Sequence, residues 1–352
     1  MTWYLIETLA PAPSASIVFK EGEHRDWTSV RTLTRSDGLD MIEDFIAEVR
    51  TSCEGLDRVE QGRLGPRRVV MRPVLGFEGE VYGIKTWVGK PDADLTPERA
   101  IASVNWDVQS LVARHTLESY MMSSISPEGF GQDRDPGQFL RKVAQFDALN
   151  ELAELCLNDG TRTHFSGRLT VLHDDTHLMA WRGLARSNAG PDGSEVRGMF
   201  HDVTDTEPPQ IAPLTALKLP TGDERRTRDE SDNAPGTVLV AYRRVPGEPE
   251  VPALIYWVSP RPSYIAESAT AHHLAQHPDA PLPGNLINPE FFDEFARAKK
   301  VLEAGQDDFE IPMVVELLGH DGSWVRVRFH IRRYPGAVGS LLHIGRFTRL
   351  ED

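Results

Sequence analysis

Apolar and polar positions alternate along two similar stretches of the chain, residues 167–205 and 311–352. In each stretch the pattern predicts a strand, a turn containing aspartate, a long strand, a turn containing glycine and a closing strand. The predicted turns are residues 173–175 and 189–193 in the first stretch, and residues 320–322 and 335–337 in the second. Asp and Gly supply the local hydrogen bonds and positive φ angles that tight turns need. We therefore expect two copies of a three-stranded meander.

Apolar residues at helical spacing precede both meanders, over residues 135–160 and 289–305. A glycine closes each of these segments, as expected at the end of a helix. The apolar positions are Phe139, Val143, Phe146, Leu149, Leu152 and Cys156 in the first segment, and Phe291, Phe292, Phe295, Val301 and Leu302 in the second. Extended segments containing Trp106 and Trp257 come before the helices. Both parts of the chain thus predict strands, a helical segment and a meander, in that order.

The first third of the chain repeats this plan more loosely. Residues 14–22 and 26–33 are predicted strands, residues 38–52 a helix, and residues 67–89 a hairpin that turns at residues 76–79. At 352 residues the chain suits two or three domains, and the pattern favours three α+β units in series.

Polar stretches that contain proline separate the units, at residues 90–98 and 204–213. The predicted domains are residues 1–92, 99–206 and 212–352. A polar segment near residues 219–236 has almost no apolar side chains, so it is predicted to be a disordered loop of the third domain.

The closing strands carry the motif of a known family. Residues 198–205 read GMFHDVTD, and the Asp202-Val203-Thr204 tripeptide resembles the end of the last strand of PAS domains. The third unit departs from it, with Arg346-Phe347-Thr348 in that place. Two strands, a helical segment and a three-strand meander is also the PAS order. The hairpin of the first unit looks more like that of the related GAF fold.

The whole chain resembles actinobacterial, particularly mycobacterial, proteins built from three PAS-like and GAF-like units without a catalytic domain. This resemblance implies an α+β fold of three tandem units, each a curved antiparallel sheet with helices on one face. It also implies a sensory or regulatory role, with a ligand that the resemblance does not identify.

The net charge excludes some classes of partner, and the number of cysteines indicates the cellular compartment. The chain has 38 Lys and Arg against 53 Asp and Glu, a net charge of -15, which argues against nucleic acid and against an anionic membrane surface as partners. Two cysteines, Cys53 and Cys156, suit a reducing compartment. No segment has the pattern of a signal peptide or a membrane span. We expect a cytoplasmic protein without membrane insertion.

Candidate chemistry is sparse. His273 and His277 lie four residues apart and are weak candidates for a metal site, because no cysteine or carboxylate cluster completes it. Cys156 does not stand in the motif of flavin-binding photoreceptors, and it is interpreted as a small core residue. Histidines on predicted strands could ligate haem, although ordinary structural roles explain them. We therefore expect no cofactor, no metal and no enzymatic activity.

Five tryptophans are candidates for lining a ligand pocket between a sheet and its helices: Trp27, Trp106, Trp181, Trp257 and Trp324. More often, an aromatic side chain at such a position simply packs in the core.

The sequence leaves three functions open. The leading one is a non-enzymatic sensory or regulatory protein that binds a small, apolar ligand, a regulatory protein partner, or both. The second is an interaction scaffold with filled cores and no ligand. The third is a sensor that depends on haem or flavin.

The exit from the second unit carries a structural prediction of its own. PAS domains commonly continue into a long signalling helix, but here Pro208 and Pro209 follow Thr204 within five residues. Proline breaks a helix and disfavours helical geometry in the residue before it. No continuous helix should therefore run from Asp205 through Pro213.

Overall fold

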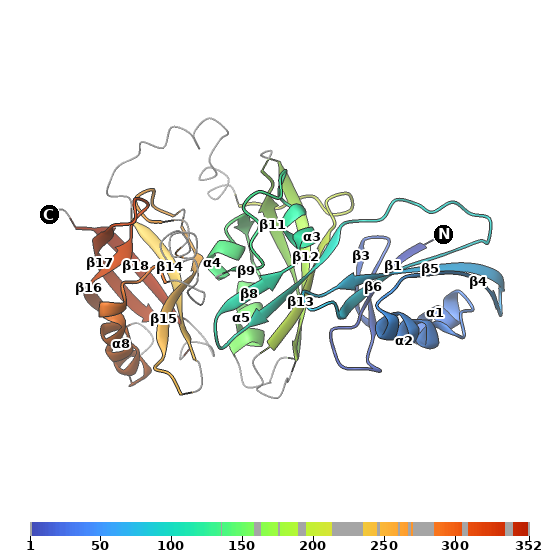
Figure 1. Cartoon of the computed structure of the whole chain (residues 1–352), viewed down its shortest axis with the longest axis horizontal. Coiled ribbons are helices and arrows are strands. Elements are labelled where there is room, and N and C mark those ends of the chain that lie inside the picture. The colour runs from blue at the N-terminus through green and yellow to red at the C-terminus, as the bar shows by residue number, and fades with distance from the viewer. Residues whose placement is uncertain are drawn as a thin grey trace.

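The computed structural model arranges the chain as three antiparallel sheets in a row (Figure 1). The structure describes residues 2–134, 136–157, 163–174, 177–188, 195–212, 235–244, 247–259, 261–266, 269, 285–304, 309–334 and 341–350. The α+β class and the three tandem units expected from the sequence are confirmed. Most of the predicted loop at 219–236 and the histidines at 273 and 277 lie outside the described residues.

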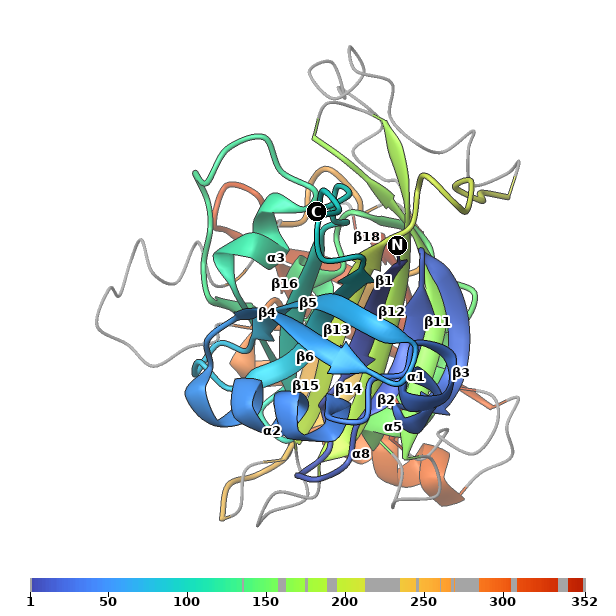
Figure 2. The same cartoon turned by 90° about the vertical axis from the view of Figure 1, so that its right-hand side faces the viewer.

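The first unit is a six-stranded sheet of order β3-β2-β1-β6-β5-β4. Its strands are β1 (Thr2–Glu7), β2 (Ser16–Lys20), β3 (Glu23–Ser29), β4 (Leu56–Gly62), β5 (Gly65–Leu75) and β6 (Val81–Gly89). Its helices are α1 (Arg31–Ser36) and α2 (Ile42–Ser52), and α2 lies in front of the strands when the molecule is viewed from this end (Figure 2). Helix α2 buries Ile42, Phe45, Ile46 and Val49. The strand predicted over 26–33 is wrong beyond Ser29, because the chain turns there into α1.

The second unit is a seven-stranded sheet of order β10-β11-β12-β13-β7-β8-β9. Its long strands are β7 (Ile101–Asp107), β11 (His164–Leu172), β12 (Leu178–Asn188) and β13 (Glu195–Asp202), and its short strands are β8 (Val112–His115), β9 (Asp133–Arg134) and β10 (Val143–Gln145). Its helices are α3 (Leu117–Met121), α4 (Pro136–Phe139) and α5 (Leu149–Leu157). The meander β11–β12–β13 lies where the alternation predicts it.

The single helical segment predicted over residues 135–160 is wrong. The chain instead forms α4, the short strand β10 and α5. Val143 and Gln145 pair with Val171 and Thr170, so backbone hydrogen bonds to the edge of β11 replace those of a helix. The apolar spacing predicted a helix wrongly because all three short elements pack on the same core. Their apolar residues therefore follow one another at spacings close to those of a single helix.

The third unit is a five-stranded sheet of order β15-β14-β18-β17-β16. Its strands are β14 (Gly236–Arg243), β15 (Val251–Trp257), β16 (Glu310–Leu318), β17 (Trp324–Arg333) and β18 (Leu342–Arg349), with η1 (Pro289–Phe291) and α8 (Phe292–Ala304) between β15 and β16. Two strands, a helical segment and a meander follow each other as the PAS resemblance implies. The first and last strands pair at the centre of the sheet.

The first two units share a core between their sheets. We call the face of a sheet that its own helices cover the inner face, and the opposite one the outer face. Outer-face residues of both sheets form one buried cluster: Leu5, Leu9, Val18, Phe19, Val74 and Tyr82 from the first unit, and Ala180, Leu184, Met199 and Val203 from the second unit. Strand β6 is buried along almost its whole length because both of its faces are covered. We call this contact the seam.

The contact between the second and third units is smaller. Leu111 and the partly buried Leu149 of the second unit pack on outer-face residues of the third, including Leu239, Ala241 and Leu342. The amide of Arg244 donates to the Gln109 carbonyl at 2.7 Å.

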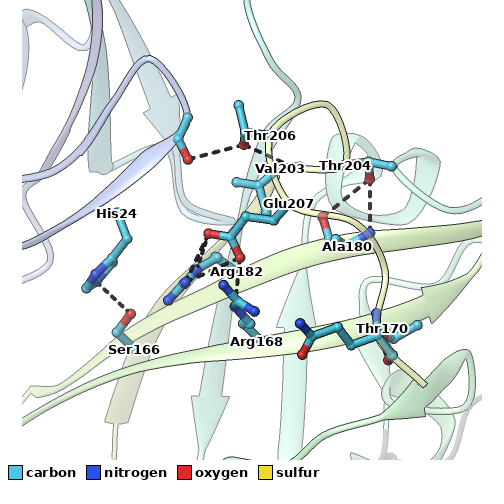
Figure 3. Close-up of polar contacts among 12 residues, drawn as sticks. His24, Ser166, Arg168, Thr170, Ala180, Arg182, Val203, Thr204, Thr206 and Glu207 are labelled. Carbon is cyan, nitrogen blue, oxygen red and sulfur yellow. Dashed lines mark hydrogen bonds and ion pairs between the residues drawn. The ribbon is translucent and has the colours of Figure 1, made fainter. Parts of the chain in front are cut away.

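The segment that leaves the second unit, residues 203–212, lies along the outer face of β11 and β12 (Figure 3). Thr204 Oγ1 accepts a hydrogen bond from the amide of Ala180 at 2.9 Å, and the carboxylate of Glu207 pairs with Arg168 and Arg182. The segment forms one turn and then an extended chain, so the prediction of no continuous helix is confirmed for residues 205–212. We call residues 203–212 the linker.

Candidate ligand cavity in the middle unit

A cavity of about 50 Å³ lies between the inner face of the second sheet and the short elements α3, β9 and α4. A water-sized group needs about 10–15 Å³ measured in this way, so the cavity has room for about four such groups. It is smaller than the engineered cavity of about 150 Å³ that binds benzene. The space therefore suits a small ligand.

The sheet side of the cavity is apolar. Leu169 and Val171 of β11, Trp181 of β12 and Phe200 of β13 line it, and Phe139 of α4 faces them. The ring of Phe200 lies 5.6 Å from that of Trp181 and 5.8 Å from that of Phe139. These side chains alternate along their strands with outer-face residues, which is why one sheet can line a cavity and also pack against the first unit.

The opposite side of the cavity carries a buried pair, His115 and Arg134. Arg134 Nε lies 3.1 Å from His115 Nε2 and 3.3 Å from the carbonyl oxygen of Gly131. Burial, together with the charge of Arg134, lowers the pKa of His115 to about 4. The imidazole is therefore neutral at physiological pH, and Arg134 brings a positive charge to the cavity wall.

Lys142 supplies a second cation. Its Nζ donates to the carbonyl of Ser123 and to Ser124 Oγ, both at 2.7 Å, and it pairs with Asp174 Oδ1 at 2.9 Å. Burial lowers the pKa of Lys142, while Asp174 opposes that effect. The hydrogen bonds fix the ammonium group between α3 and the start of β10.

Tyr120 of α3 joins the two cations. Its ring centroid lies 5.1 Å from Arg134 Cζ and 5.6 Å from Lys142 Nζ, both within the range of cation–π attraction. Thr116 begins α3, and its side chain accepts the amide hydrogen of Ser119, which lines the cavity. The helix thus presents Ser119, Tyr120 and Ser123 on one side of the space.

The cavity combines an apolar wall with cationic and hydroxyl groups. Three of its lining residues are cations, Arg134, Arg141 and Lys142, and none of the described lining residues is a carboxylate. The indole Nε1 of Trp181 is buried and has no hydrogen-bond partner among the residues that the structure describes. A buried donor without a partner is costly, so an acceptor in the cavity would stabilise it. Chemically, the site suits a small molecule with an apolar part and an anionic or strongly accepting group.

The five tryptophans named from the sequence do not come together. Trp181 lines the cavity, and Trp106 packs against the same core beside Phe139. Trp27 lies at the seam, where Arg186 stacks on its ring at 4.4 Å. Trp257 packs on the core of the third unit, and Trp324 is 42% exposed on β17.

The candidate metal and cofactor ligands are equally scattered. Among the residues that the structure describes, no three His, Cys, Asp or Glu side chains form a group able to hold a metal ion. His201 lies at the seam against Phe19, and His343 is buried on the inner face of the third sheet near Tyr242. Cys156 packs on the core of the second unit, and burial raises the pKa of its thiol to about 12, as suits a core residue.

Sequence reasoning missed most of the cavity residues. His115, Tyr120, Arg134 and Lys142 lie on four different short elements or their connections, over a region with no clear periodicity. The only available signal was a group of cations next to aromatic residues, which is common on solvated surfaces as well.

Comparison with known proteins supports the fold. Residues 2–98 match the family described as "Rv3651-like, N-terminal". A crystal structure described as a putative uncharacterized protein from Mycobacterium tuberculosis matches 99% of this chain and 96% of its own, with a TM-score of 0.70 and 17% identity. The resemblance to mycobacterial proteins of three units is thus confirmed at the level of the fold.

A second solved structure, described as an RNA-binding Light-Oxygen-Voltage receptor, covers 71% of this chain and 95% of its own at 12% identity. Its TM-score of 0.25 is too low to support a conclusion. No curated protein matches the chain. Among the described residues, no helix has both the length and the apolar composition needed to cross a membrane.

Proposed function

We propose that the protein is a non-enzymatic regulatory protein of the cytoplasm whose middle unit binds a small organic anion. The observation that carries this proposal is the cavity beside Trp181, in which an apolar wall faces Arg134, Arg141 and Lys142. A short-chain carboxylate has the matching chemistry, because its alkyl part fits the sheet side and its oxygens accept from cations, hydroxyls and the indole N–H. This ligand is more polar than the apolar one expected from the sequence.

Binding would act by shifting an equilibrium between two arrangements of the units. A ligand changes such an equilibrium only by the difference between its affinities for the two states. Tyr120 and Lys142, which line the cavity, bridge α3 and the start of β10, so occupancy would favour the arrangement in which these elements are fixed. A protein partner would then recognise that arrangement.

The test is ligand binding by the full chain, measured by calorimetry and by thermal denaturation with acetate, propionate, butyrate and succinate. Propionamide and propanol serve as neutral probes of the same size. A ligand present at 100 times its Kd stabilises the protein by about 2.7 kcal/mol, which is a shift of several degrees in Tm. We expect a carboxylate to bind and the neutral probes to be at least tenfold weaker.

Two variants locate the site. Lys142→Met should abolish carboxylate binding, and Ser119→Leu should do so by filling the cavity. The matched controls are Lys299→Met, which removes a buried lysine from the third unit, and Ser119→Ala. If no carboxylate binds the wild-type chain, or if Lys299→Met removes binding as well, the proposal is wrong and a scaffold with filled cores becomes the better description.

A further inference from the structure

Charge is strongly segregated in the third sheet. Strands β17 and β18 together carry six arginines and no carboxylate, in a chain whose net charge is -15. The arginines are Arg326, Arg328, Arg332, Arg333, Arg346 and Arg349. By chance, a chain with more acidic than basic residues would carry more carboxylates than arginines on these strands.

Three exposed arginines share the outer face. Arg326, Arg328 and Arg346 are exposed, while their inner-face neighbours Val327 and Phe347 are buried. Side chains two residues apart on a strand lie about 7 Å from each other, and neighbouring strands lie about 5 Å apart. Arg328 stands opposite Thr348, two residues from Arg346. We call Arg326, Arg328 and Arg346 the arginine face.

Two carboxylates of strand β16, Glu310 and Glu316, share the outer face with these arginines but form no ion pair with them. None of the three arginine side chains forms an ion pair or a hydrogen bond within the part of the chain that the structure describes. Glu316 stands opposite Arg326, but its carboxylate accepts from Asn288 Nδ2 at 2.7 Å, and Glu310 lies 3.6 Å from His330 Nδ1. The guanidinium groups of the face therefore keep donors that a partner can use.

The arginine face is also the uncovered part of the outer face. The second unit packs where β17 ends and β18 begins, around Tyr334, Leu342 and Ile344. The arginine face lies toward the other ends of these strands, next to Trp324 and Val314, which are 42% and 40% exposed. Strands β16 and β17 lie at the end of the molecule remote from the first unit (Figure 1).

We propose that the arginine face docks an acidic segment of a partner protein. Guanidinium groups pair with carboxylates in a planar, bidentate way, and Trp324 and Val314 offer apolar contacts beside them. The rest of the chain is strongly acidic and would repel a long polyanion, whereas a short acidic segment can meet this face alone. This inference does not depend on the ligand of the middle unit.

The test measures binding of a fluorescein-labelled peptide of ten glutamates to the full chain by fluorescence anisotropy. We expect the triple variant R326E/R328E/R346E to weaken binding at least tenfold without lowering Tm. The control R35E/R297E/K300E makes the same change in net charge at exposed positions outside the face, and should leave the affinity within twofold of wild type. High salt should weaken wild-type binding.

Other outcomes would overturn the proposal. It is wrong if the peptide does not bind, or if the control variant loses as much affinity as the triple variant. Binding of a ten-nucleotide single-stranded DNA without binding of the peptide would identify a nucleic-acid surface instead. Loss of self-association in the triple variant, seen by sedimentation velocity together with no peptide binding, would identify a second copy of the chain as the occupant.

Discussion

A buried ion pair joins the first two units and allows a quantitative test of the seam. Glu7, the last residue of β1, is fully buried. Its Oε1 accepts from Arg186 Nη2 at 3.0 Å, and its Oε2 accepts from Arg186 Nε at 3.3 Å and from the amide of Leu9 at 3.0 Å. The guanidinium of Arg186 also stacks on Trp27. Glu7→Ala would leave this guanidinium without its carboxylate.

The cost follows from the burial of the pair. Removing one partner of a buried pair costs about 3–5 kcal/mol, because the other charge stays buried and uncompensated. The Arg186 side chain is 21% exposed, so water reaches it in part and the low end of that range applies. We expect Glu7→Ala to lower the free energy of unfolding by about 3 kcal/mol. Glu48→Ala breaks an ion pair with Arg58 whose side chains are both 45% exposed, and should cost about 0–1 kcal/mol.

The assay is urea denaturation followed by tryptophan fluorescence and far-UV circular dichroism. A double-mutant cycle with Arg186→Met isolates the pair, since the double variant removes both charges and should be more stable than Glu7→Ala alone. If Glu7→Ala costs no more than Glu48→Ala, or if the double variant is less stable than both single variants, then the pair does not stabilise the seam as argued.

Three further changes test other parts of the structure. Burial, with the charge of Arg99, lowers the pKa of His201 to about 3, so below pH 6.5 the unfolded chain binds a proton that the folded chain does not. The free energy of unfolding should therefore fall by about 2 kcal/mol between pH 7 and pH 5, and His201→Gln should make this fall smaller in urea titrations. Glu207→Gln should cost about 1–2 kcal/mol and speed amide exchange in residues 204–212, and unchanged exchange would contradict the role given to its ion pairs. A Cβ added at Gly83 would lie 2.5 Å from Met199 Sδ, so Gly83→Ala should cost about 1–3 kcal/mol in thermal denaturation, and Met199→Ala should recover part of that loss.

The parts of the fold that could be predicted from sequence are those with one buried face. The meanders alternate because each strand has a covered side and a less covered side, and the α2 stripe repeats at helical spacing because one side of the helix meets a sheet. Strand β6 differs, because it is covered on both faces and is buried from Val81 to Gly89 except at Lys85.

The cavity could not be predicted, because its residues are brought together by tertiary contacts alone. Tyr120 and Lys142 are separated by 22 positions and meet only because α3 ends near the start of β10. The helical reading of residues 135–160 failed for the same reason, since pairing with β11 decides the conformation of Val143. Neither contact produces a periodic pattern of apolar residues in the sequence. Charges such as Arg134 resemble ordinary surface residues until the fold buries them.

Under the proposed function, the position of Trp181 explains how an occupied cavity could act on the rest of the chain without a signalling helix. Trp181 lines the cavity and is also one of the residues around a smaller pocket beside Glu207 and Gln210 of the linker. Its strand neighbours Ala180 and Arg182 point to the opposite face, where they hold the linker through Thr204 and Glu207 (Figure 3). A ligand that fixes Trp181 would therefore bear on its two neighbours in β12, Ala180 and Arg182, which hold the linker. Because the prolines of the linker prevent a helical relay, strand β12 is the path by which an occupied cavity would act on the linker.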